Sequence, residues 1–116
     1  MRRLLIAGNW KMHKNKAEAK GFAQELKSKI SQFPENVDIA ICAPFTQLDT
    51  LVDVLGNEKR VIIGAQNAHY EDSGAFTGEI SIPMLKEVGV DIVIIGHSER
   101  RQYFGETDET VNLKLK

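Results

Sequence analysis

A lysine and an asparagine follow the first apolar run of the sequence, residues 4–7. The Lys11 ammonium group is a positive point charge that suits a phosphate, and the Asn9 amide can donate or accept hydrogen bonds. Both side chains are therefore candidate ligand contacts. The alternative is that Lys11 is a solvated lysine after a strand, because lysine is rarely buried in proteins.

A second polar cluster, residues 96–101, follows the last apolar run, residues 91–95. We expect a strand that enters a short helical turn here, and the backbone N–H groups of such a turn disfavour positive charge on the His97 imidazole. A neutral imidazole can donate a hydrogen bond to a carbonyl oxygen and stabilise an enediolate. The alternative is a structural cluster in which Glu99 pairs with a neighbouring arginine.

The elements that would position these residues are short apolar runs separated by segments with helical spacing. The runs lack strict alternation, as expected for strands buried on both faces. The β-α alternation predicts an α/β fold with one parallel sheet and right-handed crossovers. In such folds ligands bind at the carboxyl ends of the strands, where both polar clusters stand. The predicted strands cover residues 4–7, 37–43, 61–65 and 91–95.

Helix boundaries are marked by capping residues. Asn15 and Glu18 resemble a capping box, and Gly56 is suited to a C-cap. Ser81 can cap a helix that has Pro83 in its first turn. The predicted helices cover residues 16–30, 47–55, the segment after Ser81 that ends at Gly89, and a segment from near Thr107 to Lys116.

The connection over residues 66–80 is unusually long for a βα loop, which commonly has about 2–6 residues. It contains two glycines and little periodicity. We interpret it as a candidate partner-binding loop, and the alternative is a mobile surface loop.

Composition limits the classes of partner. The formal net charge is −1, which gives no sign of general affinity for nucleic acid or for an anionic membrane. Cys42 is the only cysteine, so no disulfide forms within the chain and a cytoplasmic location is expected. The apolar runs are too short for a signal peptide or a membrane span.

Cofactor and metal motifs are missing from the sequence. His13 and His69 have no partner at metal-ligand spacing, so we expect no metal site. The glycine-rich fingerprints of dinucleotide and ATP binding do not occur. We therefore expect no cofactor, and an open nucleotide-binding sheet is the weakest alternative.

Five short motifs together resemble the triosephosphate isomerase family, in that family's order and spacing. The resemblance covers the chain from Arg3 to Lys116. The motifs are Gly8-Asn9-Trp10-Lys11-Met12, Ala43-Pro44-Phe45, Gly64-Ala65-Gln66-Asn67, Gly74-Ala75-Phe76-Thr77-Gly78-Glu79 and Ile95-Gly96-His97-Ser98-Glu99-Arg100-Arg101.

The resemblance implies an isomerase that interconverts dihydroxyacetone phosphate and glyceraldehyde 3-phosphate without cofactor or metal. Asn9 and Lys11 would then contact substrate, and Lys11 would attract its phosphate. His97 would be the neutral electrophile that polarises the substrate carbonyl. Ser98 and Glu99 would be supporting neighbours, with Glu99 held by Lys11 or by an arginine.

The long loop resembles the family's dimerisation loop. By resemblance, its tip at Phe76, Thr77 and Gly78 would enter a partner subunit near Asn9 and Lys11. The chain is therefore expected to form at least a homodimer.

Length sets this chain apart from the family. A (β/α)8 barrel takes about 250 residues, whereas the 116 residues here supply four βα units. We interpret residues 1–116 as one N-terminal half-barrel segment. The family's catalytic glutamate, which follows the sixth strand in an Ala-Tyr-Glu-Pro type motif, has no counterpart in the sequence. The family's glycine-rich phosphate-binding turns after strands seven and eight have none either, so the chain alone is expected to be inactive.

Open strand edges are the structural consequence of a half-barrel. Unpaired N–H and C=O groups at an edge favour pairing with another chain. We therefore expect self-association, and a non-catalytic scaffold or phosphate-ligand binder is the alternative function.

Overall fold

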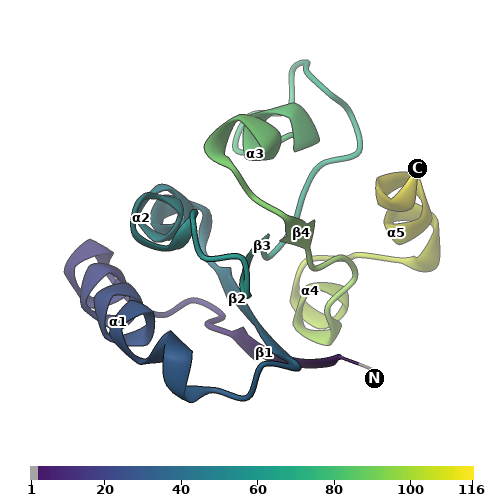
Figure 1. The fold of residues 1–116 in the computed structure, drawn as a ribbon. Helices are drawn as coiled ribbons and strands as arrows, with labels where there is room; N and C mark the ends of the chain where they lie inside the picture. Colours follow the sequence, from purple (N-terminus) through teal and green to yellow (C-terminus); the bar gives the residue numbers. More distant parts are fainter. Residues whose placement is uncertain (1–2) are drawn as a thin grey trace.

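The computed structural model describes residues 3–116 as one sheet of parallel strands with helices packed along it (Figure 1). Strands and helices alternate as predicted. The strands are β1 (Leu4–Asn9), β2 (Val37–Ala43), β3 (Val61–Ala65) and β4 (Ile92–Val93). The helices are α1 (Lys16–Lys29), α2 (Phe45–Leu55), α3 (Ile82–Val88), α4 (Ser98–Tyr103) and α5 (Asp108–Leu115), with a 3-10 turn at Ile30–Gln32.

Strand order follows chain order, β1-β2-β3-β4. The register places Asn9 opposite Cys42, and Cys42 opposite Gly64. Doubly wound nucleotide-binding sheets instead reverse their strand order near the middle. The sequential order therefore overturns the open nucleotide-binding alternative and matches half of a barrel.

The strands at the two ends of the sheet differ from their predicted bounds. β1 runs on to Asn9, two residues beyond the apolar run. β4 contains only Ile92–Val93, which is shorter than the predicted run of residues 91–95. Backbone hydrogen bonds of 2.8 Å from Asp91 to Ile63 and from Ile94 to Ala65 continue the pairing on either side.

Local capping explains where most helices begin. The Asn15 side chain accepts from the Glu18 amide at 2.9 Å, and Glu18 accepts from the Asn15 amide at 3.1 Å, which confirms the capping box. Thr107 and Thr110 form a second capping box at the start of α5, whereas at α3 the Ser81 side chain accepts from the Met84 amide without a reciprocal contact. α2 begins at Phe45 rather than Gln47, because the fixed φ of Pro44 suits the position before a first turn.

Two helices end at glycines that have different backbone conformations. Gly89 ends α3 with φ of +104°, a left-handed conformation that disfavours residues with a Cβ atom. Gly56 ends α2 as predicted but stays right-handed, with φ of −60°.

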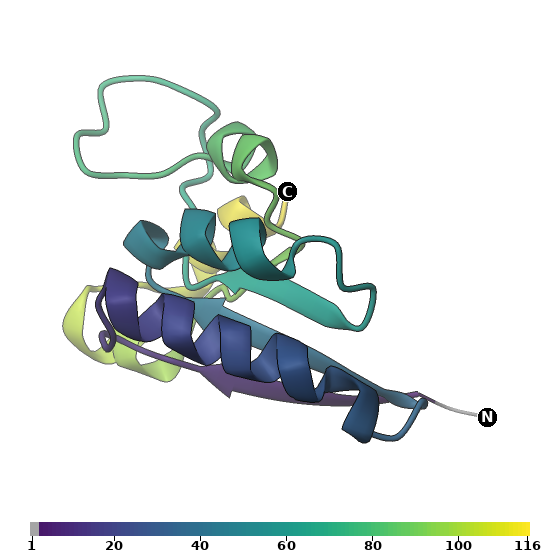
Figure 2. The ribbon, with the colours of Figure 1, turned by 60° about the vertical axis from the view of Figure 1, so that its left-hand side comes forward.

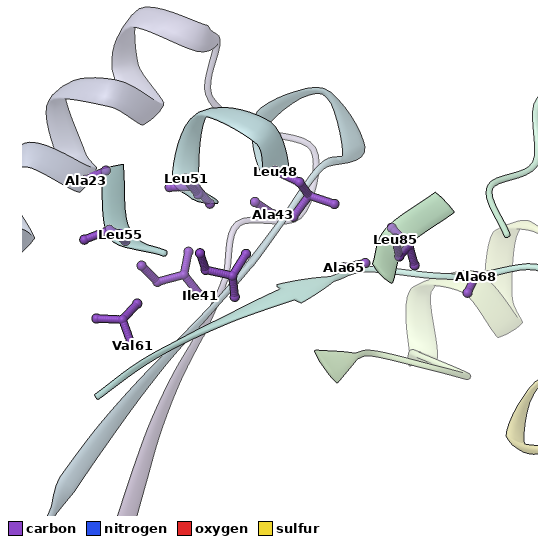
Figure 3. Packing of buried hydrophobic residues seen from close by; sticks show 11 residues of the cluster. Ala23, Ile41, Ala43, Leu48, Leu51, Leu55, Val61, Ala65, Ala68 and Leu85 are labelled. Atoms are coloured by element: carbon purple, nitrogen blue, oxygen red, sulfur yellow. The ribbon is translucent and has the colours of Figure 1, made fainter. Parts of the chain in front are cut away.

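The main core lies between the sheet and helices α1, α2 and α3 (Figure 3). Ile41 and Ile63 project from the strands against Leu51 and Leu55 of α2, and all four are almost fully buried. Each such side chain contributes about 1.5–3 kcal/mol through burial of apolar surface. This core fixes β2 and β3, and the strands that precede the two polar clusters, β1 and β4, are paired with them.

β1 is the least covered strand. Leu4, Leu5 and Ile6 are 56%, 58% and 58% exposed, although they are successive residues of one apolar strand. Within residues 3–116 this strand pairs only with β2. Both faces and one edge of β1 are therefore open to solvent.

The segment between β3 and α3 projects from the body of the fold as a long loop (Figure 2). It is the connection that the sequence singled out. Across the described residues, no helix has both the length and the apolar character that a membrane crossing requires.

Candidate active site

A cavity of about 250 Å³ opens at the carboxyl ends of the strands. Its lining includes Asn9 and Lys11 after β1, Gln66 after β3, and His97 and Glu99 at the start of α4. The two polar clusters found in the sequence therefore meet in one place, although 86 residues separate Lys11 from His97.

Lys11 has a left-handed backbone conformation, with φ of +54°. Residues with a Cβ atom rarely adopt it, and it persists where the surroundings hold it. One restraint comes from Asn9, whose Oδ1 atom accepts a hydrogen bond from the Lys11 amide at 3.0 Å. The conformation is thus linked to the side chain of a second cavity residue.

His97 is the N-cap of α4. Its Nδ1 atom accepts a hydrogen bond of 3.0 Å from the Glu99 amide. A nitrogen that accepts a hydrogen bond carries no proton, so this contact favours the tautomer in which Nε2 is the N–H donor. This geometry matches the short helical turn that we predicted at this position.

Glu99 joins the two clusters. Its Oε2 atom lies 3.0 Å from the Lys11 Nζ atom, and its Oε1 atom lies 3.7 Å from His97 Nδ1. The two arginines that follow have other partners: Arg100 pairs with Glu106, and Arg101 with Asp108. The alternative in which Glu99 pairs with a neighbouring arginine is therefore wrong.

Ser98 and the loop residues stand apart from the cavity. Ser98 is the first residue of α4 and is exposed to solvent. Phe76, Thr77 and Gly78 lie on the projecting loop, and none of the three lines this cavity. Phe76 instead packs on His69, with ring centroids 4.3 Å apart.

A buried ionic cluster beside the cavity was not predicted from the sequence. Lys114 Nζ lies 2.9 Å from Glu106 Oε2 and 2.8 Å from Asn67 Oδ1, and Arg100 also donates to Glu106. Burial raises the pKa of Glu106, but the hydrogen bonds from Arg100 and Lys114 outweigh it and leave the pKa below its usual value. No periodic pattern marks this cluster, because its members come from two loops and two helices.

Gln66 is a second residue that received no role from the sequence. Its side-chain amide lies among polar atoms of the β1 and β2 ends. The one sequence signal for Gln66 is its place in the motif Gly64-Ala65-Gln66-Asn67, directly after a predicted strand. No group of three or more metal-ligating side chains occurs within residues 3–116.

Comparison with known proteins shows which family has this sequence and this arrangement. A sequence model of the family described as triosephosphate isomerase matches residues 4–116. The triosephosphate isomerase of Trichodesmium erythraeum is 57% identical over 116 residues, covering 100% of this chain and 48% of the relative. That of Acaryochloris marina is 59% identical over 116 residues, with the same two coverages of 100% and 48%.

A solved structure agrees with the fold. The crystal structure of triosephosphate isomerase from Bartonella henselae superposes with a TM-score of 0.87 at 43% identity, covering 97% of this chain and 46% of that one. The chain spans about half the length of the relatives that it matches. On the family match, the sequence identity and the shared half-barrel, the chain belongs to the triosephosphate isomerase family.

Proposed function

We propose that this chain supplies one part of a triosephosphate isomerase active site. The reaction interconverts dihydroxyacetone phosphate and glyceraldehyde 3-phosphate by proton transfer through an enediolate. The observation that carries the proposal is the convergence of Lys11 and His97 on one cavity, with Glu99 in contact with both.

Each side chain has a chemical task in this reaction. The Lys11 ammonium group attracts the substrate phosphate and holds the substrate in the cavity. The neutral His97 ring donates from Nε2 to the substrate carbonyl and so stabilises the negative oxygen of the enediolate. Asn9 adds a hydrogen bond to the same substrate, and Glu99 supports Lys11 through their ion pair, whereas Ser98 lies outside the cavity. No step requires a cofactor or a metal.

The proton-abstracting base is the part that this half of the site does not supply. In the family it is a glutamate after the sixth strand, and residues 3–116 contain four strands. General acid–base catalysis contributes about 10²–10⁴-fold to such rates. The 116-residue chain alone is therefore expected to turn over little substrate.

A hybrid enzyme tests this proposal. The chain is joined to the residues that follow the matched region in the Trichodesmium erythraeum isomerase, and isomerase activity is compared with that of the 116-residue chain. We expect turnover from the hybrid and almost none from the chain alone. A folded hybrid without turnover would contradict the proposed function.

Self-association is a second candidate property, favoured by the exposed apolar strand β1. An open edge with Leu4, Leu5 and Ile6 in solvent is stabilised by pairing with a second copy. The projecting loop at Phe76–Gly78 would provide a further contact between copies. Sedimentation equilibrium tests this: we expect a dimer or larger species, and a stable monomer at high concentration would refute it.

A non-catalytic phosphate-ligand binder makes a different prediction from the isomerase. Phosphoglycolate would then bind the 116-residue chain, while the hybrid enzyme would stay inactive. The location that suits either function is the cytoplasm, because the single cysteine needs no oxidising compartment.

A further inference from the structure

The side-chain amide of Gln66 contacts the end of β1 from the end of β3. Its Nε2 atom lies 2.8 Å from the Lys11 carbonyl oxygen and 3.2 Å from Asn9 Oδ1. A third acceptor, the Cys42 carbonyl oxygen, lies at 3.3 Å. An NH2 group has two N–H bonds, so the shortest contact, to Lys11, takes one and the other two acceptors share the second.

These contacts restrain the two residues proposed to bind substrate. The Lys11 amide donates to Asn9 Oδ1, and the Lys11 carbonyl accepts from Gln66. Both polar backbone groups of a residue in the left-handed region are therefore fixed. Without the Gln66 donor, the Lys11 backbone would keep only the Asn9 hydrogen bond, and the Glu99 ion pair would hold the end of the Lys11 side chain.

Gln66 also determines which way the Asn9 amide points. Asn9 Oδ1 accepts from both the Lys11 amide and Gln66 Nε2. Because the oxygen takes these internal hydrogen bonds, the NH2 group of Asn9 is the end directed to a ligand. A substrate oxygen in the cavity would then meet two donors, Asn9 Nδ2 and Lys11 Nζ.

We propose that Gln66 is a positioning residue, which sets the orientation of Lys11 and Asn9 for the substrate phosphate and thereby controls substrate affinity. The proposal rests on the proposed isomerase function. Gln66 itself takes no part in proton transfer, since its contacts are to the backbone and to Asn9. Its loss therefore weakens binding of substrate and transition state alike, which raises KM more than it lowers kcat.

The test is Gln66→Met in the hybrid enzyme. Methionine has a similar volume but no N–H donor, so packing is kept while the donor is removed. We expect KM to rise roughly tenfold and kcat to change much less. The matched control is Gln24→Met on the exposed side of α1, which should leave both constants unchanged.

A lower melting temperature with an unchanged KM would overturn the proposal, because a purely structural role would produce that result. Gln66→Glu provides a second variant if the methionine variant does not fold. A carboxylate cannot donate, whereas a protonated carboxyl can, so KM should fall towards the parent value as this variant is acidified. An identical pH profile for variant and parent would also contradict the proposal.

A measurement on the 116-residue chain separates this proposal from the isomerase function. In ¹⁵N-resolved NMR spectra, Gln66→Met should shift the Asn9 side-chain amide and the Lys11 backbone amide, and Gln24→Met should not. If these resonances shift but the hybrid enzyme is inactive, the isomerase function is refuted and the positioning role remains supported. Unchanged resonances would refute the positioning role, whatever the activity.

Discussion

Lys11 and Glu99 form an ion pair of 3.0 Å between the ends of the first and last strands of the sheet. Neighbouring strands lie about 4.8 Å apart, so a flat sheet would separate β1 from β4 by roughly 14 Å. The pair forms because the sheet curls and α4 turns back towards the β1 end (Figure 1). Barrel-like curvature is thus what creates the cavity, and the cation within it is held by an acidic side chain from the opposite end of the sheet.

Removal of the Lys11 charge should abolish most of the affinity for a phosphorylated ligand. Hydrogen bonds to charged groups contribute about 1.5–3 kcal/mol, so Lys11→Met should weaken phosphoglycolate binding by roughly 10–100-fold. Isothermal calorimetry on the 116-residue chain measures this. Lys20→Met, on the exposed surface of α1, is the control and should bind as the parent does. Equal affinities in Lys11→Met and the parent would place the phosphate elsewhere.

Stability should depend on the charge of Glu106. Its folded-state pKa lies below the unfolded value, so its carboxylate contributes stability that is fully present above the unfolded pKa and is lost as the pH falls through the folded pKa. Glu106→Gln leaves the buried Lys114 ammonium without its carboxylate partner, which should cost about 3–5 kcal/mol at pH 7.

Urea denaturation at several pH values checks this dependence. The difference in unfolding free energy between Glu106→Gln and the parent should shrink as the pH falls through the folded pKa of Glu106. Glu87→Gln, on the exposed surface of α3, serves as the control and should unfold like the parent at every pH. A difference that stays constant into acid would show that the charge of Glu106 is not responsible.

Cys42 should react slowly with thiol reagents in the native chain. It lies on β2 at 3% exposure, and burial raises the pKa of its thiol, so little reactive thiolate forms at neutral pH. An Ellman-type assay should show a slow native reaction and complete reaction in urea. Stoichiometric labelling of the native chain within seconds would mean that the sheet opens around β2.

Two glycine substitutions should have opposite effects on stability. Gly89→Ala forces a Cβ atom into a backbone with φ of +104° and to 3.0 Å from a Val52 methyl carbon, and should destabilise the fold by about 1–3 kcal/mol. Gly21→Ala, in the middle of α1 with open space around it, should stabilise by about 0.5–1 kcal/mol. Thermal denaturation of both variants measures these effects. A higher melting temperature for Gly89→Ala would disprove the left-handed C-cap of α3 at Gly89.

The features that were predictable from the sequence depend on short-range rules. The caps at Asn15, Ser81 and Thr107 each involve residues within three positions. Asn15 and Ser81 were identified as caps in advance, and for Thr107 only the start of a helix nearby was predicted. The start of α2 was placed two residues late, because apolar spacing was followed instead of the proline that precedes Phe45.

Long-range contacts were beyond sequence reasoning alone. The cluster of Glu106, Lys114 and Asn67 depends on how α5 docks beside the β3 end, and no spacing rule encodes that docking. The same holds for Gln66, whose contacts to Lys11 span 55 residues. Lys11 and His97 were identified in advance because both follow apolar strands, at the edge where parallel folds bind ligands.

The most direct test of the account is the turnover of the hybrid enzyme carrying His97→Ala, which removes the side-chain donor. If the neutral imidazole polarises the substrate carbonyl, loss of this donor should lower kcat by about 10²–10³-fold, the usual cost of removing one donor to a developing oxyanion. The measurement is a steady-state isomerase assay of the variant and its parent, with folding checked by circular dichroism. A folded His97→Ala hybrid with the parent's kcat would contradict the account.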